Sequence, residues 1–190
     1  MLGIVAVLSV LGSSAVAMLH RPTPAAAAQQ WVRGRGLEVA VPGRRWRLEP
    51  STSAVQYADA RGAVRAQVRA PAVLDAGFCP SSRSSSRAFV GFLPPRPGKF
   101  ASVLSEQLGT WAAAIGGPAT PTPAVKGSRA DLDVSVPAGP CAPTTAHLTL
   151  VARATPSGVV VLVLVRDVGE PGDLGAAAAD RIVASLRSSG

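Results

Sequence analysis

The segment Gly158–Arg166 restricts the possible folds of this chain most, because its seven residues from Val159 to Val165 are all valine or leucine. A half-buried strand alternates apolar and polar residues, whereas this segment is apolar on both faces. We therefore predict a central strand that is covered on each side. The turn residues Pro156-Ser157-Gly158 would join it to the alternating segment 147–153 in an antiparallel hairpin.

Several other segments alternate in the manner of half-buried strands. In chain order, they cover 37–41, 46–48, 54–57, 64–68 and 132–136, and the short apolar run 87–93 is predicted as a further strand. In the second of them we expect Trp46 and Leu48 to face inward. The Ser/Arg tract 81–87 is predicted as a loop, because its composition is too polar to be buried.

Two segments have the period of an amphipathic helix. The first runs from about Phe100 to Ile115 and ends at a Gly-Gly-Pro sequence, after which an extended loop is expected. The second begins at Asp173, a predicted N-cap, and continues past Leu186. These elements predict an α+β fold, an antiparallel β-sheet packed with two main helices. Aromatic residues are only 4% of the chain, so we expect a core of mainly Val, Leu and Ala.

The N-terminal segment 1–19 contains no charged residue and is just long enough to span a bilayer as a helix. It is either a retained transmembrane anchor or a cleaved signal peptide. Small residues at 15–17 and 26–28 resemble cleavage sites, but no cation precedes the apolar run and the first one is Arg21. We divide the chain into this segment, a Pro/Ala/Arg linker over 20–36 and a folded domain over 37–190. The expected location is the cell membrane, single-pass with the domain outside the cytoplasm, or secretion after signal cleavage.

The chain has two cysteines, Cys79 and Cys141, both in turn-like sequences with neighbouring prolines. Their wide separation does not fit a CxxC redox motif or a zinc site. Bridged in an exported protein, they would stabilise the fold by about 4 kcal/mol in the chain-entropy model. Two free buried thiols in a cytoplasmic protein remain an alternative reading. A catalytic cysteine would need a base nearby, and the only histidines are His20 and His147.

The formal net charge is +8, and the densest basic cluster interleaves arginines with Trp31 and Trp46. Its members are Arg33, Arg35, Arg44, Arg45 and Arg47. Near an anchor, these side chains could contact anionic lipid head groups or wall polymers. The simpler interpretation is a solvated strand face. Nucleic acid is not expected as a partner, because the few aromatic residues offer little for base stacking.

We find no catalytic constellation and expect no metal and no cofactor. His147 lies in an alternating strand, where a surface or edge position is usual. We interpret two groups of acids as capping and turn residues, because general acid–base catalysis needs carboxylates that converge on one pocket. The first group is Asp131 and Asp133, and the second is Asp167, Glu170 and Asp173. No glycine-rich phosphate loop or dinucleotide motif occurs. An envelope hydrolase that uses His147 or the acids Asp167 and Asp173 is the alternative to a non-catalytic domain.

The order of these weak motifs resembles a family of uncharacterised, membrane-anchored domains of high-GC Gram-positive bacteria, usually filed as a domain of unknown function. The residues that carry the resemblance are Leu37–Pro42 with Trp46, Gly77–Cys79 with Ser81–Arg83, Trp111-Ala112, Lys126-Gly127, Cys141 after Val136-Pro137, Asp167 and Ile182–Arg187. Ala113–Ile115 departs from the family, which usually has an apolar–aromatic pair there. More distantly, the chain resembles the PsbP-like fold, an antiparallel sheet between helices in an α/β/α sandwich.

The resemblance implies an exported domain with a Cys79–Cys141 disulfide, and it supplies no catalytic residues because the family has none assigned. Our expectation is a non-catalytic, extracytoplasmic binding or accessory domain of the bacterial cell envelope. The expected partners are the membrane, through the N-terminal helix, and an unknown envelope protein, lipid or wall polymer.

Overall fold

The computed structural model describes residues 28–59, 61–116 and 124–190. The predicted anchor or signal segment, 1–19, and the first part of the predicted linker lie outside these residues. Within them, no helix is long and apolar enough to cross a membrane.

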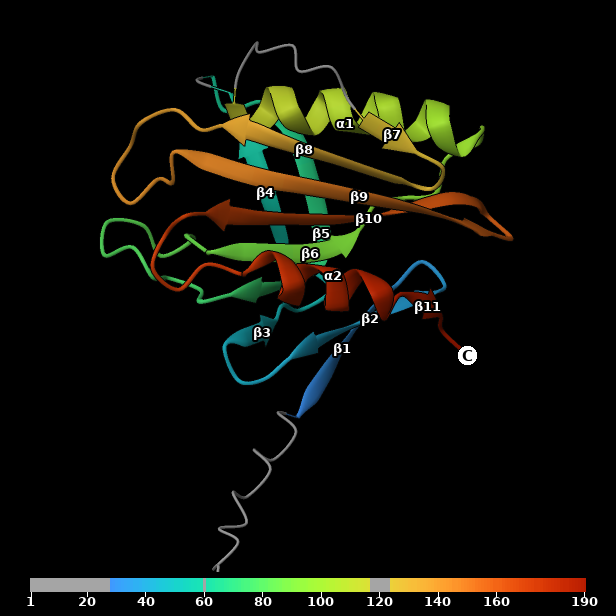
Figure 1. Ribbon diagram of the computed structural model, residues 1–190, viewed down its shortest axis with the longest axis horizontal. Helices are drawn as coiled ribbons and strands as arrows, with labels where there is room; N and C mark the ends of the chain where they lie inside the picture. Colours follow the sequence, from blue (N-terminus) through green and yellow to red (C-terminus); the bar gives the residue numbers. More distant parts are fainter. Residues whose placement is uncertain (1–27, 60, 117–123) are drawn as a thin grey trace, which may run out of the picture.

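A large antiparallel sheet of eight strands forms the centre of the domain (Figure 1). Its strands are β3 (Trp46–Leu48), β4 (Ala54–Ala58), β5 (Val64–Leu74), β6 (Ala88–Phe92), β7 (Ala124–Lys126), β8 (Arg129–Ser135), β9 (Thr145–Thr155) and β10 (Gly158–Val168). Their order is β3-β5-β6-β10-β9-β8-β7, and β4 pairs with β5. Strand β10 lies between β6 and β9 and is buried from Val159 to Val165, so the predicted central strand and its hairpin are confirmed.

A second, three-stranded sheet contains both ends of the described chain. It consists of β1 (Gln29–Gly34), β2 (Leu37–Pro42) and β11 (Arg187–Ser188), with β2 in the middle. The prediction that 20–36 is all linker is therefore wrong for Gln29–Gly34. These residues lack a clear period, but β2 supplies backbone partners along their whole length and Val32 is buried. The end of the chain was predicted to be helical and instead pairs with β2.

Two helices cover opposite faces of the large sheet, so the fold is α+β as predicted. Helix α1 (Phe100–Gly116) matches its prediction. Helix α2 (Ala176–Ala184) is shorter, because Gly175 and not Asp173 is its N-cap residue. The Asp173 carboxylate instead accepts a hydrogen bond from the Gly169 backbone, within a turn. Leu48, predicted to face inward, is 42% exposed on the edge strand β3.

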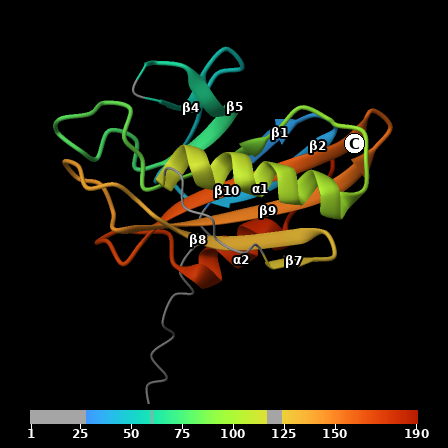
Figure 2. The same ribbon diagram turned by 90° about the horizontal axis from the view of Figure 1, so that it is seen from above.

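The core has two layers, one on each face of the large sheet. In β10, Val161, Val163 and Val165 pack with α1, whereas Val160, Leu162 and Leu164 pack with α2 and the small sheet. Viewed from above, α1 crosses in front of the large sheet and α2 lies behind it (Figure 2). We call these two sides the α1 face and the α2 face.

A bulge in β5 lets one strand contribute to both layers. Ala66 and Val68 belong to the α1 layer, while Ala72 and Leu74 belong to the α2 layer. The register shifts between Arg69 and Ala72, where Ala70 has a positive φ of 48°. An extra residue reverses which side chains point to each face and bends the strand. The first half of β5 and its partner β4 consequently run across the other strands toward α1 (Figure 1).

Candidate functional site

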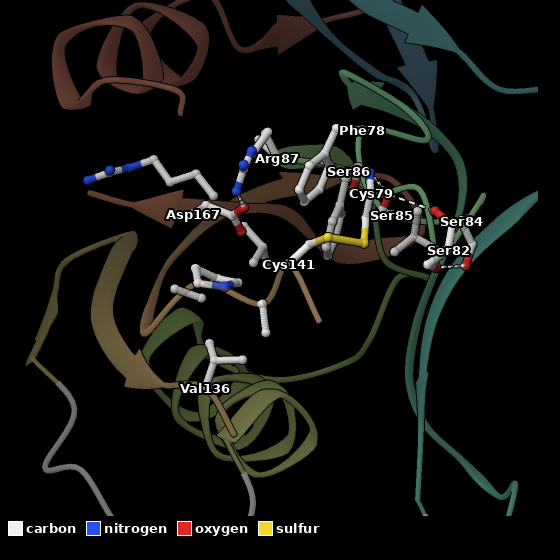
Figure 3. A pocket seen from close by; sticks show the side chains of 18 of the residues that line it. Phe78, Cys79, Ser82, Ser84, Ser85, Ser86, Arg87, Val136, Cys141 and Asp167 are labelled. Carbon is white, nitrogen blue, oxygen red and sulfur yellow. Dashed lines mark hydrogen bonds and ion pairs between the residues drawn. A yellow bond between two sulfur atoms is a disulfide. The ribbon is translucent and has the colours of Figure 1, made fainter. Parts of the chain in front are cut away.

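A pocket lies at the end of the large sheet where two long loops meet on the α1 face. The β5–β6 loop carries Cys79, and the β8–β9 loop carries Cys141. A disulfide joins them, with 5.8 Å between their Cα atoms (Figure 3). The pairing implied by the family resemblance is confirmed, and the free-thiol and catalytic-cysteine readings are wrong. The disulfide fixes the two loops to each other and forms part of the pocket wall.

The pocket has a volume of about 290 Å³, and most of its wall is apolar. Phe89, Val165 and Ala146 come from the large sheet, while Ile115 comes from the end of α1. Tyr57 from β4 lines the pocket and belongs to an aromatic cluster, in which its ring lies 6.3 Å from Phe89 and 6.1 Å from Trp111. The bulge in β5 makes this possible, because it directs the β4–β5 hairpin toward the helix.

Serine side chains order the loop on one side of the pocket. The predicted Ser/Arg loop is confirmed as a loop, but it is internally bonded. Ser85 Oγ accepts a hydrogen bond from the Cys79 backbone at 2.9 Å and donates to the Ser82 carbonyl at 2.8 Å. Ser82, Ser84, Ser85 and Ser86 all line the pocket (Figure 3). This wall therefore presents hydroxyl groups opposite an apolar floor.

An ion pair forms the charged part of the pocket. Arg87 Nη1 donates to Asp167 Oδ2 at 3.0 Å, and only 14% and 12% of the two side chains are exposed. The Arg87 guanidinium also lies over the Phe78 ring, 3.8 Å from its centroid. Glu170 is a second acidic neighbour of Arg87, at 3.9 Å. A cation held between an aromatic ring and a carboxylate is well positioned to bind polar groups of a ligand.

Burial changes the acidity of two groups in the pocket. It raises the pKa of Asp167 above its ordinary value, against the opposing effect of Arg87. Burial also raises the pKa of Tyr57, and the negative charge of Asp167 contributes in the same direction. Tyr57 therefore keeps its proton and remains a hydrogen-bond donor. The pocket thus combines an apolar floor with a hydroxyl, a guanidinium and a carboxyl group.

His147 does not belong to this pocket. On β9, Ala146 and Leu148 face α1, so His147 between them faces α2. There it joins the polar cluster, a set of side chains on the α2 face that consists of Arg129, Asp131, Asp133, His147, Thr149, Arg166 and Asp180. His147 Nδ1 lies 2.6 Å from Asp133 Oδ1. Asp131 and Asp133 were interpreted as capping or turn residues, and they instead lie within strand β8.

The two parts of the alternative hydrolase hypothesis are consequently separated by the sheet. His147 is opposite Arg166 in the register of β9 and β10. Val165 packs in the α1 layer, so strand alternation directs Asp167 to the α1 face and Arg166 to the α2 face. Asp173 is engaged in its turn. Among the described residues, no group of three or more His, Cys, Asp or Glu is arranged to hold a metal ion.

The five arginines of the predicted basic cluster lie in two groups near opposite ends of β2. Arg33 and Arg35 lie at the turn between β1 and β2, while Arg44, Arg45 and Arg47 follow the opposite end of β2. A six-residue strand separates the two groups by about 20 Å. Three of the five are ion-paired: Arg33 with Glu38, Arg45 with Asp75 and Arg47 with Glu49. Trp46 is buried, and Trp31 stacks with Arg187.

Sequence reasoning assigned no functional role to Arg87, Tyr57 and Arg166. Arg87 was placed in the strand 87–93 without a role, and Tyr57 was placed only in a hairpin. Arg166 was assigned only to the end of the central strand. A signal was available for Arg166, because it directly follows the apolar run Val159–Val165. A charged residue that continues a buried strand is itself buried, and buried charged residues are rare unless they have a partner.

Comparison with known proteins gives a family but no function. The family model described as "Domain of unknown function (DUF8017)" matches residues 20–190. No curated protein matches the chain. The matched range includes both cysteines and the whole pocket, so both are parts of the family domain.

Proposed function

This chain belongs to the DUF8017 family, and we propose that its domain is a non-catalytic, extracytoplasmic binding module of the bacterial cell envelope, anchored by residues 1–19. Its site is the disulfide-walled pocket, and its ligand is a small amphipathic molecule. The apolar part of that ligand lies on Phe89, Val165 and Ala146. Its polar part contacts Arg87, Asp167 and Tyr57.

The pocket is the observation that carries this proposal. It places a charged pair with little solvent exposure beside aromatic side chains, and a small number of polar groups in a largely apolar cavity is usual for small-molecule sites. Its volume of about 290 Å³ suits a ligand with one ring or a short chain. Binding rather than catalysis is favoured because the carboxyl group of Asp167 is paired with Arg87.

The disulfide supports a location outside the cytoplasm, because structural disulfides persist in oxidising compartments. The anchor rests on the uncharged sequence 1–19. The antiparallel sheet with helices on both faces supports a likeness to the PsbP-like fold. Secretion after signal cleavage remains the alternative to anchoring.

Ligand binding can be tested with 4-fluorobenzamide, an aromatic ring with one polar group, by ¹⁹F NMR of the full-length chain. We expect the probe signal to broaden with the wild-type protein. Ala142→Phe fills the pocket and should abolish the broadening. Ala138→Phe is the matched control, because Ala138 lies in the same loop and outside the pocket wall. Equal broadening with all three proteins, or none with the wild type, would contradict the proposed site.

The location can be tested on protein purified from cells whose thiols were blocked at lysis. We expect no reactive thiol after denaturation and an intact mass that includes residues 1–19. A mass that corresponds to a chain starting after residue 19 would contradict the anchor and support secretion after signal cleavage. Two free thiols would overturn the extracytoplasmic location.

A further inference from the structure

Arg166 is a buried cation whose side chain is incompletely bonded. The residue is 9% exposed, and among the described residues its Nε is the buried side-chain nitrogen or oxygen without a hydrogen-bond partner. Guanidinium groups stay protonated at all pH values of interest. Burying such a group without an acceptor is costly, so the surroundings of Arg166 need an acceptor that the chain does not supply to Nε.

A cavity of about 230 Å³ on the α2 face adjoins this side chain. The sheet wall consists of residues from three neighbouring strands. They are Arg166 on β10, His147 and Thr149 on β9, and Arg129 and Asp131 on β8. Helix α2 forms the opposite wall through Ala176, Ala179 and Asp180. The small alanine side chains leave the space between the helix and the sheet open.

The acids around this cavity already have partners. Arg129 donates to Asp131 through Nε at 2.7 Å and to Asp180 through Nη2 at 3.0 Å. Asp131 also accepts a hydrogen bond from Thr149 at 2.8 Å. Asp133 is bonded to His147. The polar cluster therefore satisfies its carboxylates internally, and the cation of Arg166 is left for another group.

We propose that this cavity is a second binding site, specific for a carboxylate group, in which Arg166 is the principal ligand. The planar guanidinium matches the two oxygens of a carboxylate. A singly charged group is preferred over phosphate because Asp131, Asp133 and Asp180 repel each additional negative charge. Apart from Arg166, which lines both cavities, the residues of this site differ from those of the proposed ligand pocket. The carboxylate site therefore does not depend on the ligand of that pocket.

The proposal can be tested with the ¹⁵N-labelled full-length chain by following the Arg166 Nε–Hε signal in NMR titrations at constant ionic strength. The probes are acetate, acetyl-Ala-Ala, which presents the same group on a peptide, and inorganic phosphate. We expect the Arg166 Nε–Hε signal to shift saturably with both carboxylates. Tighter binding of acetate would identify the natural ligand as a small free acid, and tighter binding of acetyl-Ala-Ala would identify it as the C-terminus of a peptide. Phosphate should bind more weakly than either.

Two pairs of variants complete the test. Acetate binding to the variants is measured by the increase that acetate causes in the melting temperature of the protein. Arg166→Gln should weaken this binding by about tenfold or more. Arg181→Gln removes the same charge from an exposed position on α2 and should leave binding unchanged. Ala176→Phe should block the cavity while retaining Arg166, and Ala177→Phe, exposed on the same helix, is its control.

Several results would overturn the carboxylate site. These are a shift that does not saturate by about 100 mM, tighter binding of phosphate, or acetate binding that survives in both Arg166→Gln and Ala176→Phe. Ala142→Phe, which fills the pocket on the α1 face, should leave acetate binding intact. The two sites can therefore fail separately.

Discussion

The two faces of the large sheet are covered in different ways. On the α1 face, one helix of 17 residues packs against the sheet, and its Trp111 lies 5.8 Å from the Phe89 ring. On the α2 face, the cover is composite: a helix of nine residues lies beside a small sheet made from both ends of the described chain. A single continuous helix gives the first face a compact apolar core. The second cover depends on contacts between distant parts of the sequence.

Polar contacts hold the parts of the second cover together. Ser185 Oγ, next to α2, accepts a hydrogen bond from the Ala40 backbone at 2.8 Å. Glu38 on β2 is bonded to both Arg33 and Arg187, which connects the three strands of the small sheet. Close packing adds to this, because a Cβ atom at Gly34 would come within 3.2 Å of the Phe92 side chain. One continuous helix therefore covers the α1 face, whereas chain ends cover the α2 face and leave room for a polar cavity. We expect stability to be concentrated on the α1 face.

The largest expected effect is on the α1 face. Trp111→Ala should lower the free energy of unfolding by about 3–5 kcal/mol, because the side chain is 1% exposed and leaves a large cavity under a helix that cannot collapse into it. Urea unfolding followed by circular dichroism measures this. Trp111→Phe, as a control, should recover part of the loss. A smaller loss of unfolding free energy in Trp111→Ala than in Ile182→Ala would contradict the expectation that the α1 face contributes more to stability.

The disulfide should have the next largest effect. Replacing both cysteines by serine should destabilise the fold by about 2–4 kcal/mol, because the bridge closes a loop between residues 62 positions apart. The same variant should also weaken binding of the pocket probe, since the two loops are no longer held together. Unfolding in urea and the ¹⁹F titration test the two parts, and an unchanged stability would show that the loops are fixed by other contacts.

Removal of a buried side chain on the α2 face should cost less. Ile182→Ala should destabilise by about 2–3 kcal/mol, although Ile182 is as fully buried as Trp111. The short helix near the chain end can shift to fill the smaller cavity. Hydrogen exchange should then increase in β1, β2 and β11 while the amides of β9 and β10 stay protected. Equal exchange in all strands would indicate that the two layers unfold as one unit.

The smallest expected effect is on the loss of stability at low pH. Protonation of Glu38, in the cover of the α2 face, and of Asp167, on the α1 face, should change the free energy of unfolding in opposite directions. Hydrogen bonds from Arg33 and Arg187 lower the pKa of Glu38 from its ordinary 4.5, so its stabilisation is present above that pH and lost as the pH falls through the lowered value. Burial raises the pKa of Asp167 above its ordinary 3.8, so protonation there favours the folded state as the pH falls. Urea unfolding between about pH 3 and 6 should therefore show less acid destabilisation in Glu38→Gln than in wild type, and more in Asp167→Asn. Parallel curves for all three proteins would contradict both assignments.

Local patterns predicted the elements that lie in the middle of the core. Helix α1, the hairpin of β9 and β10 and the hairpin of β4 and β5 follow from periodicity, because each of these segments is apolar on the side where it is buried. The loop character of the Ser/Arg tract follows from its polarity. The same patterns failed at β1 and β11, whose residues are mostly polar and become strands only because β2 offers them backbone partners.

By itself, the sequence determined the α+β class, the central strand and the position of the long helix, because burial imposes a period on nearby residues. Only the tertiary structure decided where the functional side chains lie. The bulge at Ala70 turned β4 toward α1, and the two cysteine loops met at one end of the sheet. The alternation of β10 then put Asp167 and Arg166 on opposite faces. Contacts between residues far apart in the chain have no local period, so no pattern in the sequence predicts them.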